Sequence, residues 1–228
     1  MLPTMFVPLA GVAAGFLHVL SGPDHLAAVA PLAARAHQGA WKTGARWGLG
    51  HSAGVALVGL LALGLREALP VDAISAWSER VVGVMLIGIG LWSLRQAAQI
   101  KIHTHAHTHD GETHEHVHFH SPKPARVHDS GRHAHTHAAL GIGTLHGLAG
   151  SSHFLGVLPA LALPTTSDAV AYLLAFAFGT VLAMTGFSSA LGLFSRRLGG
   201  GGRGYRGLMQ ACAVAAIGIG AWWLVAAV

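Results

Sequence analysis

The first long apolar run of the chain contains the segment Gly15-Phe16-Leu17-His18-Val19-Leu20-Ser21-Gly22-Pro23-Asp24-His25-Leu26. Two histidines and an aspartate therefore fall where the chain should cross a bilayer, and ionisable groups at that depth indicate a functional site. The Gly22-Pro23 pair predicts a helix break, because proline lacks a backbone donor and clashes with the preceding turn. On a straight helix His18 and His25 would lie about 10 Å apart along the axis. A break would bring them together with Asp24 beside them.

The composition is that of a helical membrane protein. The chain is 52% hydrophobic and only 10% charged, whereas soluble domains contain about 25% charged residues. Its single cysteine, Cys212, excludes an intrachain disulfide and a thiolate cluster. The sequence pI of about 10.1 does not indicate nucleic acid binding, because the few basic residues follow the membrane topology.

The apolar runs predict an all-α polytopic fold with six transmembrane helices. The first run is too long for one straight crossing of about 30 Å, which again predicts a break. The expected spans are approximately Met5–Ala34, Ala45–Leu69, Val81–Ala98, Ala138–Leu163, Ala169–Phe194 and Leu208–Val228.

The basic residues predict the orientation of these spans. Twelve of the 14 Lys and Arg residues flank or lie in the loops after spans one, three and five, and only Arg66 and Arg80 fall on the other side. The positive-inside rule places those loops in the cytoplasm. We therefore expect a multi-pass protein of the bacterial cytoplasmic (inner) membrane with both termini outside and the loop after span three in the cytoplasm.

The two halves of the chain resemble each other. Residues 15–25 align with residues 143–153, so that both histidines match, and the offset drifts only from 128 to 130 along the rest of the chain. Each half holds three spans, so the second copy must cross the membrane in the opposite sense. We predict two inverted three-helix repeats, 1–100 and 138–228, separated by a segment at 101–137, with broken helices one and four.

This arrangement predicts one metal site at the interface of the repeats, near the bilayer midplane. Imidazoles with one carboxylate and no thiolate suit Ni²⁺, Co²⁺, Zn²⁺ or Cu²⁺, whereas Mg²⁺ and Ca²⁺ prefer oxygen ligands. Ser152 replaces the aspartate in the second copy, so the predicted site is asymmetric. The expected metal ligands are His18, Asp24, His25, His51, His146 and His153, and His51 could equally be a packing histidine.

The segment 101–137 is a histidine-rich tract with few apolar residues. Such tracts are typical of metal binding, and we expect a disordered loop when no metal is bound. Binding should weaken near and below pH 6.5, where histidine protonates. The expected auxiliary ligands are His103, His105, His107, His109, His114, His116, His118, His120, His133, His135 and His137.

The motif His18-(five residues)-Asp24-His25, the segment 46–52 (RWGLGHS) and the segment 145–152 (LHGLAGSS) resemble the nickel/cobalt transporter superfamily. The last segment is similar to the urease-accessory-type nickel permease branch. The resemblance implies a secondary permease for Ni²⁺ or Co²⁺ in which His18, Asp24, His25 and His51 serve transport. Uptake permeases of this superfamily have four residues between the first histidine and the Asp-His pair, and eight spans. Six spans with a histidine-rich loop also resemble the nickel/cobalt efflux branch.

The sequence thus predicts a permease rather than an enzyme. Its substrate would be a divalent metal ion, with no prosthetic group and no nucleic acid partner. The lipid bilayer is an expected partner, and a cytoplasmic metallochaperone is a candidate partner. Uptake is preferred over efflux as the direction of transport. The alternatives are a haem or di-iron intramembrane redox protein and a membrane-anchored metal sensor or buffer.

Overall fold

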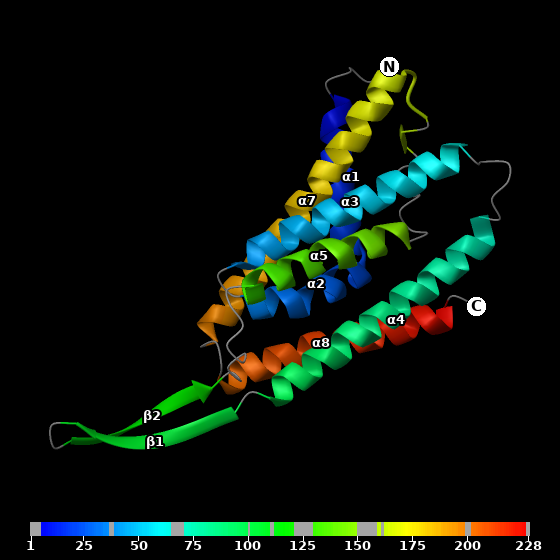
Figure 1. Ribbon diagram of the computed structural model, residues 1–228. Helices are drawn as coiled ribbons and strands as arrows, with labels where there is room; N and C mark the ends of the chain where they lie inside the picture. Colours follow the sequence, from blue (N-terminus) through cyan, green and yellow to red (C-terminus); the bar gives the residue numbers. More distant parts are fainter. Residues whose placement is uncertain are drawn as a thin grey trace.

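The computed structural model describes residues 6–36, 39–64, 71–99, 101–109, 112–120, 130–149, 159–160, 162–198 and 202–226. Long helices form the body of the molecule, and a two-stranded ribbon extends from one end (Figure 1). The elements are α1 (Phe6–Ser21), α2 (Pro23–Ala36), α3 (Ala40–Gly64), α4 (Val71–Ala98), β1 (Lys101–His109), β2 (Glu112–His120), α5 (Ser130–Leu148), α7 (Thr166–Arg197) and α8 (Arg203–Ala226).

The predicted break in the first apolar run is confirmed. α1 and α2 are bent by 76° relative to each other, and Gly22 is the one residue between them. The Gly22 N–H still donates to His18 O at 3.1 Å, and the Ser21 hydroxyl donates to the same carbonyl at 3.2 Å. The His25 N–H then donates to Gly22 O at 3.1 Å, so backbone hydrogen bonds continue on both sides of the bend although the axis changes direction.

Four candidate membrane spans are present among the described residues. Glu79–Ala98, α7 and α8 are each long and apolar enough to cross a bilayer, and the bent pair α1–α2 is the fourth. α3 and the shorter apolar helix Ala138–Leu148 occupy the second and fourth predicted spans. The membrane portion is therefore helical as predicted, whereas the count of six stays a prediction. Residues 150–158, where the second break is expected, lie outside the described residues.

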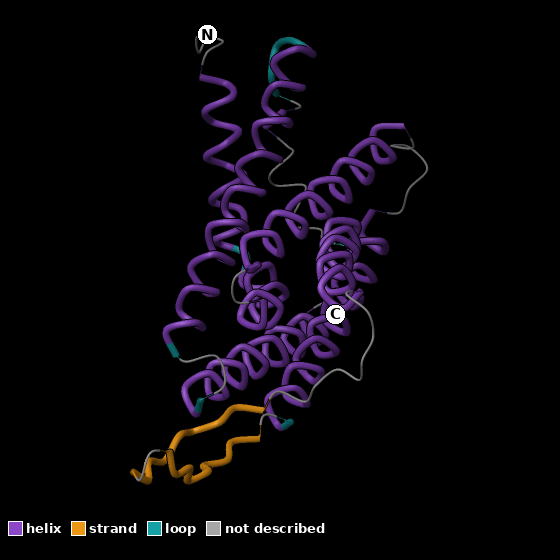
Figure 2. Tube along the Cα trace, turned by 60° about the vertical axis from the view of Figure 1, so that its left-hand side comes forward, coloured by secondary structure: helices purple, strands orange, loops and turns teal. Residues whose placement is uncertain are grey.

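The structure differs from the predicted disordered loop at residues 101–120. β1 and β2 pair there as an antiparallel ribbon (Figure 2), so the chain as a whole is not all-α. Alternation of His with Thr, Ala, Val or Phe gives a period of two, which suits a strand. α5 also begins at Ser130, earlier than the predicted boundary at 138. His133, His135 and His137 therefore lie in this helix and not in a loop.

Glycines allow α1 to pack closely on α7. A Cβ atom built on Gly15 would overlap the backbone carbonyl oxygen of Phe176, and one built on Gly179 would overlap the carbonyl oxygen of Val12. Small residues at such crossings are typical of membrane helices, which associate through close backbone contact. The two helices lie side by side in Figure 1.

α3 and α5 pack in the same way. A Cβ atom on Gly143 would overlap the carbonyl oxygen of Trp47, and one on Gly50 would overlap that of Leu140. These four residues are the partners of Gly15, Phe176, Gly179 and Val12 at the sequence offset of 128 to 129. The contact between α3 and α5 thus repeats the contact between α1 and α7.

α4 and α8 form a third pair, and the two helices lie side by side apart from the other helices in Figure 1. A Cβ atom on Gly220 would lie 2.6 Å from Gly83 O, and one on Gly90 would lie 2.7 Å from Ala213 O. At an offset of 130, Gly90 is the partner of Gly220 and Gly83 is the partner of Ala213, so each of these two contacts is the repeat copy of the other. The same numerical relation therefore holds at three helix crossings.

We expect Gly143→Ala to destabilise the protein by about 1–3 kcal/mol, because the added methyl group forces α5 away from Trp47 O. The matched control is Gly141→Ala on the same helix, where a Cβ atom would have no neighbour within 4 Å. The control should keep or raise the melting temperature, since alanine favours a helix. Thermal unfolding of the purified protein in detergent measures both, and equal melting temperatures would contradict the packing described here.

Candidate metal centre

Four helices bring one carboxylate and four imidazoles together. His18 lies near the end of α1, Asp24 and His25 lie in the first turn of α2, His51 lies on α3 and His146 lies near the end of α5. The 76° bend places the His18 and His25 rings in edge contact, with centroids 4.6 Å apart and planes at 83°. Because seven residues of straight helix would separate them by about 10 Å, the bend creates this site.

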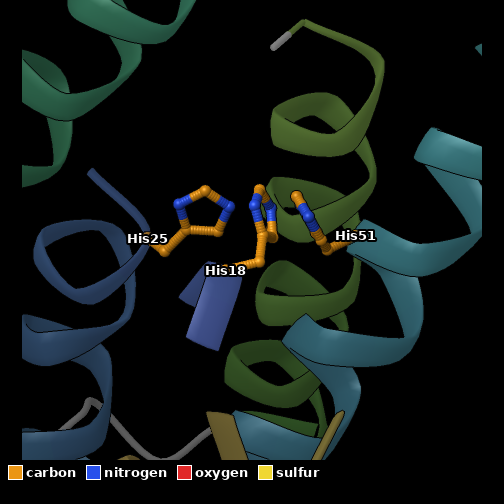
Figure 3. A group of neighbouring side chains, drawn as sticks. All are labelled: His18, His25 and His51. Atoms are coloured by element: carbon orange, nitrogen blue, oxygen red, sulfur yellow. The ribbon is translucent and has the colours of Figure 1, made fainter. Parts of the chain in front are cut away.

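His18, His25 and His51 form one group of potential ligands (Figure 3). One ligand atom from each residue lies within 4.8 Å of the others. The His25 and His51 ring centroids are 4.9 Å apart, and the His18 and His51 rings stack at 5.9 Å. Three imidazoles at these distances need only small side-chain movements to bind one ion.

Asp24, His25 and His146 form a second group within the same distance limit. His25 Nδ1 lies 3.0 Å from Asp24 Oδ1, and His146 Nε2 lies 3.2 Å from Asp24 Oδ2. Both carboxylate oxygens therefore contact an imidazole nitrogen, which offsets the cost of burying the charge. The hydrogen bond between His25 Nδ1 and Asp24 Oδ1 is of the kind that fixes the orientation of a ligating imidazole.

The cluster is enclosed by protein. His25, His51, His146 and Asp24 are at most 4% exposed, whereas His18 is partly exposed. The Trp47 ring stacks on His51 at 5.0 Å with an interplanar angle of 11°. Water therefore has little access, and each ion–ligand interaction is strengthened by the low dielectric of the surroundings.

Aromatic residues support the histidines on both sides. Trp47 also contacts His146 at a centroid distance of 5.2 Å, and Phe176 contacts His18 at 5.5 Å. Trp47 and Phe176 are partners at offset 129, and His18 and His146 are partners at offset 128. The pair on α1 and α7 thus corresponds to the pair on α5 and α3.

Five of the six predicted membrane ligands lie together: His18, Asp24, His25, His51 and His146. His153 lies outside the described residues. Sequence reasoning did not identify Trp47 or Phe176 as parts of the site. A usable signal existed, because Trp47 precedes His51 by four residues and so shares its helix face.

The predicted auxiliary ligands are placed by their backbone. Three rungs of the β1–β2 ribbon pair histidine with histidine directly across the ladder. They are His103–His118, His105–His116 and His107–His114. Residues directly opposite and residues two apart share one face of a ribbon, so these six positions fall on a single face.

The donor set suits a borderline divalent ion. Imidazole nitrogen is a good ligand for Ni²⁺, Co²⁺, Zn²⁺ and Cu²⁺, and a single carboxylate adds one negative charge. The only cysteine, Cys212, lies on α8 and belongs to neither group. The arrangement can bind a divalent transition metal inside an apolar protein without a thiolate.

Comparisons with known proteins identify relatives of this chain. A family model described as "Cytochrome C biogenesis protein transmembrane region" matches residues 9–222. Two Arabidopsis thaliana proteins, Chloroplast protein FOR GROWTH AND FERTILITY 1 and 2, are 36% and 37% identical over 189 residues. That match covers 82% of this chain but 50% and 47% of the two relatives. The chain therefore spans about half of their length.

A third relative is the Urease accessory protein UreH from Bacillus sp. (strain TB-90). It is 26% identical over 196 residues, which are 80% of this chain and 75% of UreH. No solved structure matches the chain.

We expect Gly22→Ala to weaken metal binding by at least about tenfold, because supporting contacts of a ligating histidine typically change affinity by that factor. The new Cβ atom would overlap His25 Nδ1 and lie 3.0 Å from Asp24 Oδ1, so it would separate the two side chains. The control is Gly39→Ala, where a Cβ atom has no neighbour within 4 Å. Co²⁺ titration of both folded variants is the measurement, and wild-type affinity in Gly22→Ala would contradict the described geometry.

Proposed function

The chain belongs to the cytochrome c biogenesis protein transmembrane region family, and we propose that it is a secondary transporter of a divalent transition metal ion. The preferred substrates are Ni²⁺ and Co²⁺. The observation that carries the proposal is the buried cluster of four imidazoles and one carboxylate at the meeting point of α1, α2, α3 and α5. Ionisable residues among apolar helices are costly to retain without a function.

The helix packing supports an inverted-repeat transporter. The contacts of α1 with α7 recur between α5 and α3, and those between α4 and α8 exchange with each other. We propose two repeats, 1–100 and 138–228, each with three spans, and His153 as a further ligand. In transporters of this design the substrate site lies near the midplane between the repeats and is exposed alternately to either side.

The relatives also bear on the substrate. One of them is named as a urease accessory protein, which agrees with the urease-accessory-type permeases that the sequence resembles. We propose uptake as the direction, with efflux as the alternative. The sequence contains no phosphate-binding loop of the GxxxxGK[ST] type, so the energy would come from an ion gradient, the membrane potential or a separate partner.

Basic residues support an orientation in the membrane. Most of them lie in the last turns of α2, α4 and α7 and in the first turns of α3 and α8, and these helix ends lie at the end of the helical body from which the ribbon extends (Figure 1). We propose that this end faces the cytoplasm, in keeping with the positive-inside rule. The ribbon would then bind metal on the cytoplasmic side and pass it to a metallochaperone. The basic residues at this end include Arg35, Lys42, Arg46, Arg95, Arg196, Arg197, Arg203 and Arg206.

An intramembrane redox protein is the second candidate, because the family description refers to cytochrome c biogenesis and histidines ligate haem and di-iron centres. The geometry favours transport over this alternative. A porphyrin would have to lie between two imidazoles that here contact each other. The two ligand groups contain one carboxylate, whereas di-iron sites use several. The visible absorption spectrum of the purified protein separates the two functions, because bound haem absorbs strongly.

Cells that express the wild type should accumulate more radioactive nickel or cobalt than cells with an empty vector. His18→Ala should reduce this excess at least about tenfold, because loss of one ligand is enough to impair such a site. Leu17→Ala is the matched control, since Leu17 is 62% exposed on the same helix. Accumulation below the vector level, restored by His18→Ala, would identify an exporter. No difference for any expressed variant, for either metal, would contradict the proposal.

The histidine ribbon should bind Ni²⁺ at pH 7.5 and release it below about pH 6.5, because only neutral imidazole binds metal and its unperturbed pKa is about 6.5. Equilibrium dialysis of the full-length protein measures this binding. A full-length variant in which the six histidines paired across the β1–β2 ribbon are replaced by asparagine should lose most of the bound ions and keep transport. Loss of transport in that variant, at equal expression, would show that the ribbon is part of the pathway.

A further inference from the structure

His25 is the one residue that belongs to both potential ligand groups. The first group consists of His18, His25 and His51, and the second consists of Asp24, His25 and His146. The His25 ring lies in edge contact with each neighbouring imidazole, at centroid distances of 4.6, 4.9 and 4.7 Å to the rings on α1, α3 and α5. It is therefore the centre of the cluster.

The two groups face different edges of the His25 ring. Nδ1 lies 3.0 Å from Asp24 Oδ1, whereas a ring nitrogen of His25 points towards His18 in Figure 3. An imidazole binds a metal ion through the in-plane lone pair of the ring nitrogen that carries no proton. Its two nitrogens point away from each other, so they cannot face the same ion. The cluster thus offers two adjacent metal positions that share a ligand.

The positions differ in charge and in burial. The first consists of three imidazoles and no carboxylate, and the second has a carboxylate that partly neutralises a divalent ion. Two ions could not be held at once, because an imidazole that keeps its ring proton has one lone pair to share and two divalent ions would repel each other strongly across it. His18 is the one partly exposed member of the cluster, so the three-histidine position is the more accessible of the two.

We infer that a transported ion occupies these two positions in turn, with His25 as the shared ligand. This inference rests on the proposed transport function and adds a step to it. The ion first binds among His18, His25 and His51. It then exchanges those outer ligands for Asp24 and His146 while the His25 ring rotates, so that the same unprotonated nitrogen stays bound and no ring proton has to move. Each position alone binds an ion, whereas passage needs both.

Trp47 provides a readout confined to this cluster. It contacts both His51 and His146, so Co²⁺ in either position should quench its fluorescence. Trp47→Phe identifies the signal, because it removes this indole and leaves the five other tryptophans of the chain. Titration of the full-length protein with Co²⁺ gives the affinity, and cellular cobalt accumulation gives transport.

His51→Gln removes the first position, and His146→Gln removes the second. Each single variant should still bind Co²⁺ within about tenfold of the wild-type affinity, since one position remains. Each should lose transport, because passage needs both positions. The double variant His51→Gln/His146→Gln should lose at least about 100-fold more affinity than the two single losses combined, a coupling of the size seen between interacting sites. In the matched control His18→Gln/His51→Gln both substitutions fall in the first position. Its Co²⁺ affinity should therefore equal that of His51→Gln.

A single site that uses all five ligands gives a different pattern. Each lost ligand would then weaken binding separately, and the control double variant would bind more weakly than either of its parents. That result, or wild-type transport in a single variant, would overturn the two-position inference and leave the proposed transport function intact. Absence of Trp47-dependent quenching in the wild type would contradict the proposed function itself. Asparagine replaces glutamine at any position where the glutamine variant does not elute as a folded protein.

Discussion

The bend at Gly22 is the constraint on which the rest of the site depends. A membrane helix satisfies its own backbone, so a change of direction is tolerated only where the freed groups find partners. Here the His25 N–H donates to Gly22 O across the bend, and the Ser21 hydroxyl donates to His18 O. A continuous helix would place His18 and His25 on one face but about 10 Å apart. The 76° bend turns this separation into ring contact and places Asp24 where it can orient two imidazoles.

Close backbone contact holds the surrounding helices in register with this bend. Gly15 lets α1 approach the Phe176 carbonyl, and Gly143 lets α5 approach the Trp47 carbonyl. The rings of these two aromatic residues also pack on the cluster, Phe176 on His18 and Trp47 on His146. One local arrangement, used twice, therefore sets both the distance between helices and the position of a histidine of the cluster.

Much of the site could be predicted from sequence, because ionisable residues in apolar segments are informative and the internal match pairs His18 with His146. Proline at position 23 located the helix break by its known stereochemistry. The sequence could not show that the ligands divide into two groups around His25, since this depends on ring orientations set by tertiary packing. The low apolar content of residues 101–120 predicts disorder, whereas their period-two pattern suits the β1–β2 ribbon that the structure contains. The second break and His153 lie outside the described residues, so those predictions stand untested.

In the proposed function, the cluster around His25 carries a divalent transition metal ion through the protein. The most direct measurement is Co²⁺ entry into liposomes that contain the purified protein and an enclosed metal-sensitive dye. We predict a saturable entry rate for the wild type and no rate above empty liposomes for His25→Gln, because this substitution removes the ligand common to both groups. Equal rates for the wild type, His25→Gln and empty liposomes would contradict the claim, and so would a wild-type rate in the variant.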